Sequence, residues 1–373
     1  MKIAFIYDVV YPYVKGGVER RLYELGKRLA RKHEVVWLTL KWWEGEDRIE
    51  KEGIQVVSMG DPKELYHGGK RSISEAVYFA WKLLFRRETL RDFDVVDCQE
   101  FPYLSCYTCR LSLPKETSFV ITWHEFWGSY WRDYLGTAGI IGLQIERGLT
   151  KLTKHHIAVS KTTKNFLKEM GISATLVPNG IDFKEIEKIR RGEKGFDFLF
   201  VGRLVKHKNV DLLLRSVAHV KKEYPDVTLG IIGDGPERSK LEFLAKDLGI
   251  SSNVEFLGFL ENHEEVISMM KSSKVFAFPS GREGFGMVVL EANASGIPAV
   301  VVDHPLNASK DLIVPWKNGF VSKNSEKDFA EHLIVAYEEW KRLGKNAKSM
   351  TRKYDWDLIA KGLEKYYRGI LND

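Results

Sequence analysis

The sequence predicts an α/β protein with two Rossmann-like domains, and three observations support this prediction. The chain has 373 residues, which is too long for one typical domain and sufficient for two domains that each bury a core. In both halves short apolar runs alternate with amphipathic stretches, the pattern of repeated βα units and therefore of parallel sheets with buried strands. A turn cluster, Val177-Pro178-Asn179-Gly180, lies between the two series and marks the domain boundary.

The first half opens with an apolar strand and continues with an amphipathic helix. In the helix predicted at 18–32, Val18, Leu22 and Leu25 fall on one stripe and basic residues on the opposite face. The strands expected in this half are 2–9, 34–39, 53–58, 94–98, 119–123 and 156–159.

The second half repeats the same alternation. Its expected strands are 196–201, 228–233, 254–257, 275–279, 299–302 and 319–321, and its clearest helices are 211–224 and 236–248. An amphipathic pattern at 356–371 predicts a final helix. Open α/β sheets bind ligands at the carboxyl ends of their strands, so we expect the functional residues there.

Composition narrows the class of protein. A net charge of +6 and 44% apolar residues fit a globular protein with an acidic ligand, and the absence of a basic block argues against nucleic-acid binding. Cys98, Cys106 and Cys109 cannot all pair, which favours a reducing cytoplasm. No leader peptide and no membrane span are expected. The sequence thus favours a cytoplasmic protein, either soluble or peripheral on the inner face of the membrane.

A pair of glutamates eight positions apart is the most informative motif. A loop with two glycines leads into an apolar helical stretch, with Glu283 at the helix mouth and Glu291 about two turns inside. Helical rise puts these carboxylates about 10 Å apart, close to the span from a pyranose through a diphosphate to a ribose. The N–H groups of Phe285, Gly286 and Met287 would then meet the distal phosphate. An ordinary helix entry with solvated acids is the alternative.

Two cations and a pair of glycines complete the phosphate-binding candidates. Arg203 and Lys208 follow the strand predicted at 196–201, where fixed cations would stabilise the charge that builds on a departing phosphate. Solvated loop cations are the alternative. Gly16-Gly17 falls between the first strand and the first helix, so the backbone there could approach a phosphate or an acceptor, or simply form a tight turn.

Three further segments accompany the glutamates in a fixed order: Pro178-Asn179-Gly180-Ile181-Asp182, Gly202-Arg203-Leu204-Val205-Lys206-His207-Lys208 and Gly233-Asp234-Gly235-Pro236. With them the chain resembles the family 4 glycosyltransferases, retaining enzymes of the GT-B fold, most densely from 178 to 296. The resemblance implies two Rossmann-like domains that face each other across a cleft. Residues 1–177 plus 356–373 would form the acceptor domain, and residues 178–355 the nucleotide-sugar donor domain.

The resemblance also implies roles for single residues. His124 would contact the donor sugar and support an oxocarbenium-like transition state through its backbone carbonyl, whereas the alternative is a packed, hydrogen-bonded core histidine. Gly258-Phe259 would lie beside the nucleotide base. Asp234 could serve the site or start the following helix. The chain departs from the family at 206–209, which lacks the usual glycine and where Lys206 could compete with Lys208, and in the loop 302–311.

The reaction implied is the transfer of a sugar from a nucleoside-diphosphate sugar, with UDP or GDP as the expected nucleotide, to a glycan, a lipid-linked or a small-molecule acceptor. No acid stands out as the nucleophile for a covalent intermediate. The resemblance therefore favours retention by a front-face route, in which the leaving phosphate takes the acceptor proton and neither a metal nor a cofactor takes part. A GT-B-fold sugar-nucleotide epimerase and an inactive sugar-nucleotide-binding protein are the alternatives.

Two aromatic stretches bear on the acceptor. The run 126–134 follows His124, and its rings suit sugars or a membrane interface equally. The stretch 77–87 combines aromatic and aliphatic residues with Lys82, Arg86 and Arg87. It could rest on anionic lipid, as a lipid-linked acceptor would require, or form core with a solvated edge.

Overall fold

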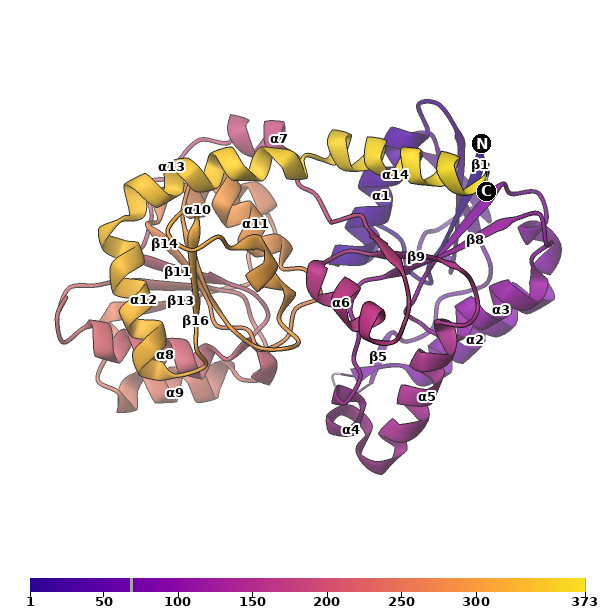
Figure 1. Ribbon diagram of the computed structural model, residues 1–373. Helices are drawn as coiled ribbons and strands as arrows, with labels where there is room; N and C mark the ends of the chain where they lie inside the picture. The colour runs from indigo at the N-terminus through magenta and orange to yellow at the C-terminus, as the bar shows by residue number, and fades with distance from the viewer. Residues whose placement is uncertain (68–69, 373) are drawn as a thin grey trace. The chain divides into compact units, whose positions relative to one another are not determined.

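The computed structural model describes residues 1–67 and 70–372 (Figure 1). The chain divides into two units, Met1–Asn179 with Trp356–Asp373, and Gly180–Asp355. The boundary expected after residue 177 lies close to this division. Both units are α/β, as the sequence predicts.

The first unit contains an eight-stranded sheet with the order β10-β9-β8-β7-β1-β2-β4-β3. Every neighbouring pair is parallel except β3 with β4 at the edge. The strand order reverses between β1 and β7, as in a Rossmann sheet. The strands are β1 Lys2–Ile6, β2 Glu34–Thr39, β3 Arg48–Lys51, β4 Ile54–Ser58, β7 Val95–Gln99, β8 Ser118–Trp123, β9 His155–Ala158 and β10 Ala174–Leu176, with a separate antiparallel pair of β5 Tyr66–His67 and β6 Lys70–Arg71.

Helices separate most strands of the first unit, except that β2 to β6 follow one another directly. The helices are α1 Gly17–Leu29, α2 Ile73–Phe85, α3 Leu104–Ser112, α4 Tyr130–Leu135, α5 Gly139–Leu149, α6 Lys161–Glu169 and α14 Trp356–Ile370, with single-turn η1 Arg87–Leu90 and η2 Gly136–Ala138. Leu22, Leu25 and Leu29 of α1 are buried as predicted. In the described part of the chain, no helix has both the length and the apolar character needed to cross a bilayer.

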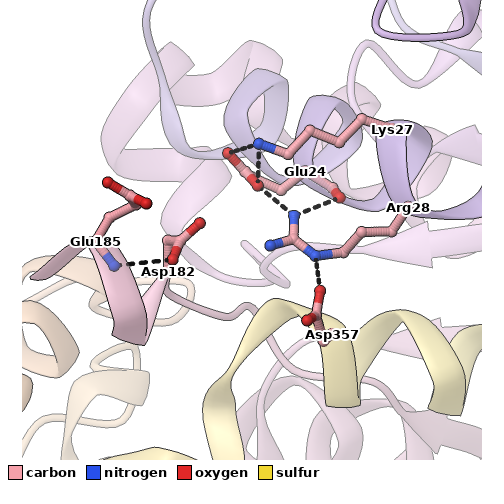
Figure 2. A network of polar contacts seen from close by, with 6 residues as sticks. All are labelled: Glu24, Lys27, Arg28, Asp182, Glu185 and Asp357. Carbon is pink, nitrogen blue, oxygen red and sulfur yellow. Dashed lines mark hydrogen bonds and ion pairs between the residues drawn. The ribbon is translucent and has the colours of Figure 1, made fainter. Parts of the chain in front are cut away.

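The C-terminal helix α14 lies beside α1 in the first unit, as the resemblance implies (Figure 1). Arg28 of α1 donates from Nε to Oδ1 of Asp357 at 2.6 Å and also contacts the Glu24 carboxylate of its own helix. Figure 2 shows this guanidinium between the two acids, with Lys27 on the other side of Glu24. Tyr367 reaches further inward, where its hydroxyl donates to Oδ2 of buried Asp97 at 2.5 Å.

The second unit contains a parallel six-stranded sheet with the order β13-β12-β11-β14-β15-β16. Numbered within the unit this is the Rossmann order 3-2-1-4-5-6, which reverses between β11 and β14. The strands are β11 Phe198–Val201, β12 Leu229–Ile232, β13 Val254–Gly258, β14 Val275–Phe278, β15 Ala299–Val302 and β16 Gly319–Ser322. The helices are α7 Phe183–Lys188, α8 Val210–Val220, α9 Arg238–Asp247, α10 His263–Ser272, α11 Met287–Ala294, α12 Glu326–Glu338 and α13 Trp340–Thr351, with single-turn or slightly longer η3 Lys206–Lys208, η4 Ser251–Asn253, η5 Ala308–Leu312 and η6 Arg352–Tyr354.

All twelve expected strands are present, and β2 and β15 have the expected bounds. Strands β3 and β10 of the first unit's main sheet are additional, as is the separate pair of β5 and β6. Strand β3 has the sequence Arg-Ile-Glu-Lys and lies half-exposed at the sheet edge, and β10 has only three residues. Neither carries the buried apolar run on which the prediction relied.

Candidate functional site

The loops that follow β11, β14 and β15 meet at the carboxyl edge of the second unit's sheet. These three strands are neighbours, and the strand order reverses between the first two. Backbone hydrogen bonds connect the loops: the Gly281 N–H donates to the His207 carbonyl at 2.8 Å, and the Glu283 N–H donates to the Leu306 carbonyl at 2.9 Å. This is the place at which open α/β sheets bind ligands.

Lys208 and Glu283 form a close ion pair between two of these loops. Lys208 Nζ donates to Glu283 Oε1, and both side chains are largely buried, at 16% and 14% exposure. The same carboxylate oxygen accepts from the Ser280 hydroxyl at 2.8 Å, and Lys208 Nζ lies 5.1 Å from the centre of the Phe278 ring. The sequence indicates both charged residues but not their contact.

Lys206 and Arg203 occupy more open positions. Both side chains are exposed in the loop after β11, so Lys208 is the lysine of this segment that is held in the cluster. His207 is half-buried, and its burial together with the nearby Arg282 and Lys208 charges lowers its pKa to about 4. It is therefore neutral at physiological pH and adds no charge to the loop.

Asn209 lies at the position where the resemblance implies a glycine. Its φ is +55°, in the left-handed region, and it precedes α8 as the cap residue. Asparagine tolerates this conformation better than other non-glycine residues. Asn209 thus provides a left-handed turn between the ion-paired Lys208 and α8.

The relation between the two glutamates differs from the prediction. Helix α11 begins at Met287, so Glu283 is a loop residue four positions before the helix and not at its mouth. Gly286, with φ +90°, breaks the regular rise. The helical rise used to estimate the separation therefore does not extend to Glu283, and the separation itself stays a prediction. Glu291 lies on α11 as expected, is buried, and has His263 Nε2 3.3 Å from its Oε1.

Gly286 can only be glycine in this arrangement. Besides its positive φ, a Cβ on this residue would lie 2.5 Å from Cβ of Ser309. The close packing brings the start of α11 against the loop after β15. Met287 is the first residue of α11 and Gly286 its cap, and the first N–H groups of a helix have no partner within the helix. The N–H of Met287, together with those of Phe285 and Gly286 just before it, therefore stays a candidate for an anion.

The loop after β15 takes its shape from Asn307, which the sequence analysis did not identify as important. The side chain is fully buried, donates to the Val302 carbonyl at 2.7 Å and accepts from the Ser309 hydroxyl at 2.6 Å. Ala308 N–H then donates to the Glu283 carbonyl at 2.8 Å. The atypical loop thus fixes the Glu283 backbone.

The structure also gives the positions of two residues expected beside the nucleotide base and of one residue expected in a turn. Gly258 ends β13 with φ +74°, and Phe259 after it is 69% exposed. Asp234 Oδ1 accepts from the Gly235 N–H at 2.6 Å and its Oδ2 pairs with Arg238 at 3.2 Å. Of its two expected roles, the structure shows stabilisation of the turn before α9.

In the first unit, Gly16 is the cap residue of α1 and Gly17 its first residue. A Cβ on Gly16 would lie 2.5 Å from Glu19 Oε2, so the Glu19 carboxylate folds back over the helix start. Burial raises the pKa of Glu19 to about 7. A phosphate at this position would have to displace that carboxylate. The ligand-binding roles of Gly16 and Gly17 therefore stay a prediction.

His124 lies just beyond β8 in a buried polar chain. Its Nε2 is 2.8 Å from Gln99 Oε1, and Gln99 Nε2 donates to Asp97 Oδ1 at 3.1 Å. Because a carboxylate only accepts, Asp97 orients the amide and the histidine proton is on Nε2. Burial and then the Arg21 charge lower the pKa of His124. Asp97 also accepts from Tyr367 of α14. The sequence alone does not indicate this series of hydrogen bonds.

The aromatic run 126–134 packs mostly inside the first unit. Trp127 and Trp131 are buried with ring centres 4.7 Å apart. The Glu146 carboxylate accepts from the N–H groups of Trp127 and Gly128. Interpreting the two tryptophans as a free surface for sugars or membrane is therefore wrong.

Two family models match the chain. The first is described as Glycosyltransferase Family 4 and covers residues 15–185, and the second is described as Glycosyl transferases group 1 and covers residues 182–350. An uncharacterised glycosyltransferase of Methanocaldococcus jannaschii is 32% identical over 57% of this chain and 59% of its own length. The chain spans about half the length, from 39% to 59%, of the first three curated relatives that it matches.

Solved structures agree on the architecture. A sucrose-phosphate synthase of Thermosynechococcus elongatus aligns with a TM-score of 0.80 at 18% identity, over 100% of this chain and 99% of its own. HepE of Anabaena, solved in complex with UDP and glucose, aligns with a TM-score of 0.74 at 18% identity, over 99% of this chain and all of its own. At these identities the likeness shows a shared fold.

Proposed function

Because the chain is a family 4 glycosyltransferase with the GT-B fold, we propose that it transfers a sugar from a nucleoside-diphosphate sugar to a glycan, a lipid-linked or a small-molecule acceptor. UDP or GDP is the nucleotide that we propose for the donor. A structural neighbour solved with UDP and glucose supports a donor of this class. The donor site is assigned to the carboxyl edge of the second unit's sheet.

The single observation that carries the proposal is the Lys208–Glu283 pair in the loops at the β11–β14 reversal. In the proposed mechanism Lys208 and Arg203 stabilise the negative charge that develops on the departing diphosphate. The N–H groups at the start of α11 would hold the distal phosphate. Glu283 would bind sugar hydroxyls, and buried Glu291 the ribose hydroxyls. Held by Lys208 and Ser280, the Glu283 carboxylate is already oriented before the donor arrives.

We further propose that the transfer retains the anomeric configuration without a metal or another cofactor. The protein cations would carry the charge stabilisation, and the leaving phosphate would take the proton of the acceptor hydroxyl. His124, neutral because burial lowers its pKa, would act through its backbone carbonyl. Proton NMR of the product anomer tests retention, and an inverted product contradicts it. Undiminished turnover in excess chelator tests metal independence, and a loss restored by a divalent ion contradicts it.

A panel of UDP-, GDP- and ADP-sugars, assayed for nucleotide release with and without glycan acceptors, tests the function. We expect acceptor-dependent release from one class of donor. Two other results would favour the remaining alternatives. Conversion of the sugar to its epimer without a second product indicates an epimerase. Binding of the sugar nucleotide without turnover on any acceptor indicates a binding protein.

A further inference from the structure

Helix α2 in the first unit is apolar on two faces, and the described residues cover one of them. Its inner face buries Phe79, Ala80 and Leu83. The outer face carries a continuous stripe, defined here as the α2 stripe, formed by Ile73, Val77, Trp81, Leu84 and Phe85. These side chains are 63%, 49%, 48%, 41% and 69% exposed, respectively.

The spacing of the α2 stripe aligns its side chains. Positions separated by four residues lie on the same side of a helix, so Ile73, Val77 and Trp81 follow one another along α2. The Trp81 and Phe85 rings are in contact, with centres 4.5 Å apart. A surface helix of a globular protein normally presents polar residues outward. The exposed apolar side chains of the α2 stripe, with two aromatic rings in contact, therefore indicate a binding partner with an apolar surface.

The charges beside the α2 stripe are positive. Lys82 Nζ lies 5.3 Å from the centres of both the Tyr78 and the Trp81 rings, and Lys63 Nζ lies 4.9 Å from the Tyr78 ring. Exposed Arg86 and Arg87 follow the helix directly. These cations border the aromatic end of the stripe.

The acids nearby do not cancel this charge along the helix. Glu75, the acid of α2, is fully buried, with Arg71 3.8 Å away. Burial and the adjacent Asp8 raise its pKa to about 9, so it is largely uncharged at neutral pH. Glu88, just after the helix, pairs with Arg91 at 2.7 Å and lies at the longer distance of 4.0 Å from Arg87. The outward face of α2 therefore offers apolar surface and cations, but no carboxylate.

We propose that the α2 stripe docks the protein on an anionic lipid bilayer. The combination of an apolar face, tryptophan and phenylalanine, and flanking lysine and arginine is what an interfacial helix needs to enter the headgroup region. A second copy of the chain fits less well, because the same face of α2 has no carboxylate with which to pair the cations of a copy. The docking residues all lie in the first unit, outside the proposed donor site, and do not depend on it.

The test is vesicle flotation of the intact chain with neutral phosphatidylcholine vesicles and with vesicles containing phosphatidylglycerol. We expect binding to the anionic vesicles that weakens as salt is raised. The double variant Trp81→Ser with Phe85→Ser should lower the partition coefficient at least about tenfold. The triple variant Lys82→Gln, Arg86→Gln and Arg87→Gln should lose the preference for anionic vesicles.

A matched control is available on the other unit. Phe243 of α9 is 72% exposed, and Phe243→Ser should leave flotation unchanged. Absence of flotation with both kinds of vesicle, or an equal loss in the Phe243→Ser variant, would overturn the proposal. Dissociation of a dimer by the Trp81 and Phe85 substitutions, with flotation unaffected, would also overturn it and assign the stripe to a second copy.

The folding control is nucleotide affinity, because the proposed donor residues lie in the second unit. Nucleotide affinity thus reports on the second unit, and circular dichroism of each variant, which sums over both units, should match that of the parent if the first unit is also folded. If vesicles bind as expected while no sugar nucleotide is bound or turned over, the proposed function fails and the docking proposal stands. If a sugar nucleotide is turned over and vesicles are not bound, the docking proposal alone fails.

Discussion

Replacing Lys208 by alanine removes the cation that the proposed mechanism places on the leaving diphosphate. It also leaves the largely buried Glu283 carboxylate without its ion-pair partner, next to a position that must accept a dianionic leaving group. We expect kcat/KM to fall at least about a hundredfold, equivalent to roughly 2.7 kcal/mol of transition-state stabilisation. Glu283→Ala should produce a loss of similar size, because it removes the group that binds the sugar and orients the lysine.

The double variant is the sharper experiment. Independent residues would give the product of the two losses, about ten-thousandfold, whereas two residues that act as a pair should show a coupling of about 0.5–3 kcal/mol and a smaller combined loss. The assay is nucleotide release at low donor concentration, with the donor that the panel identifies.

The exposed Lys194–Glu255 pair of the same unit, with side chains 50% and 48% exposed, is the control. Lys194→Ala should change kcat/KM by less than about twofold, since exposed ion pairs contribute little. Near-normal activity in both single variants of the Lys208–Glu283 pair would refute the site assignment.

Three further substitutions test other parts of the structure. The pKa of Glu19 is raised from 4.5 to about 7 in the folded state. Because the folded protein then binds this proton more tightly than the unfolded chain, the free energy of unfolding falls by about 3 kcal/mol as pH rises from about 4.5 through 7. Glu19→Gln should therefore be more stable than the parent at pH 8 and flatten the pH dependence of urea unfolding, and an unchanged slope contradicts the raised pKa. Gly286→Ala should destabilise the second unit by at least about 1 kcal/mol, because Gly286 has a positive φ and an added Cβ would meet Ser309. The same substitution should lower turnover. An unchanged melting temperature and unchanged turnover would show that the loop does not need this conformation. Tyr367→Phe removes a hydrogen bond to the buried Asp97 carboxylate and should cost about 1–3 kcal/mol in denaturant unfolding of the first unit, whereas a cost near zero would show that α14 is held by its apolar contacts alone.

The sequence was sufficient for most strands of the two main sheets because most central strands are apolar runs, although β7 carries Asp97 and Gln99. Strand β15, from Ala299 to Val302, is fully buried and has the predicted bounds. The edge strand β3 alternates exposed and half-buried residues over four positions, and such a segment cannot be distinguished from a loop by hydropathy. The charged residues of the candidate site were found by their position after strands, where their spacing along the chain is informative.

Contacts between distant segments could not be predicted in the same way. Gln99 and His124 meet because β7 and β8 pair in parallel with Gln99 opposite Thr122, a register that no local pattern specifies. No functional role was predicted for Asn307, yet its buried amide shapes the loop that holds Glu283. The error in placing Glu283 at the mouth of the helix has a local cause. The positive φ of Gly286 delays the helix to Met287, and a glycine in a sequence does not reveal its φ.

Calorimetric titration of UDP and GDP into the intact chain and into the Lys208→Ala variant tests the central claim most directly, that the loops after β11, β14 and β15 hold a nucleoside diphosphate. We predict saturable binding of at least one of these nucleotides to the parent chain, weakened at least about tenfold, or about 1.4 kcal/mol, by the substitution. Absence of affinity for any nucleoside diphosphate or sugar nucleotide, or equal affinity in parent and variant, would contradict it.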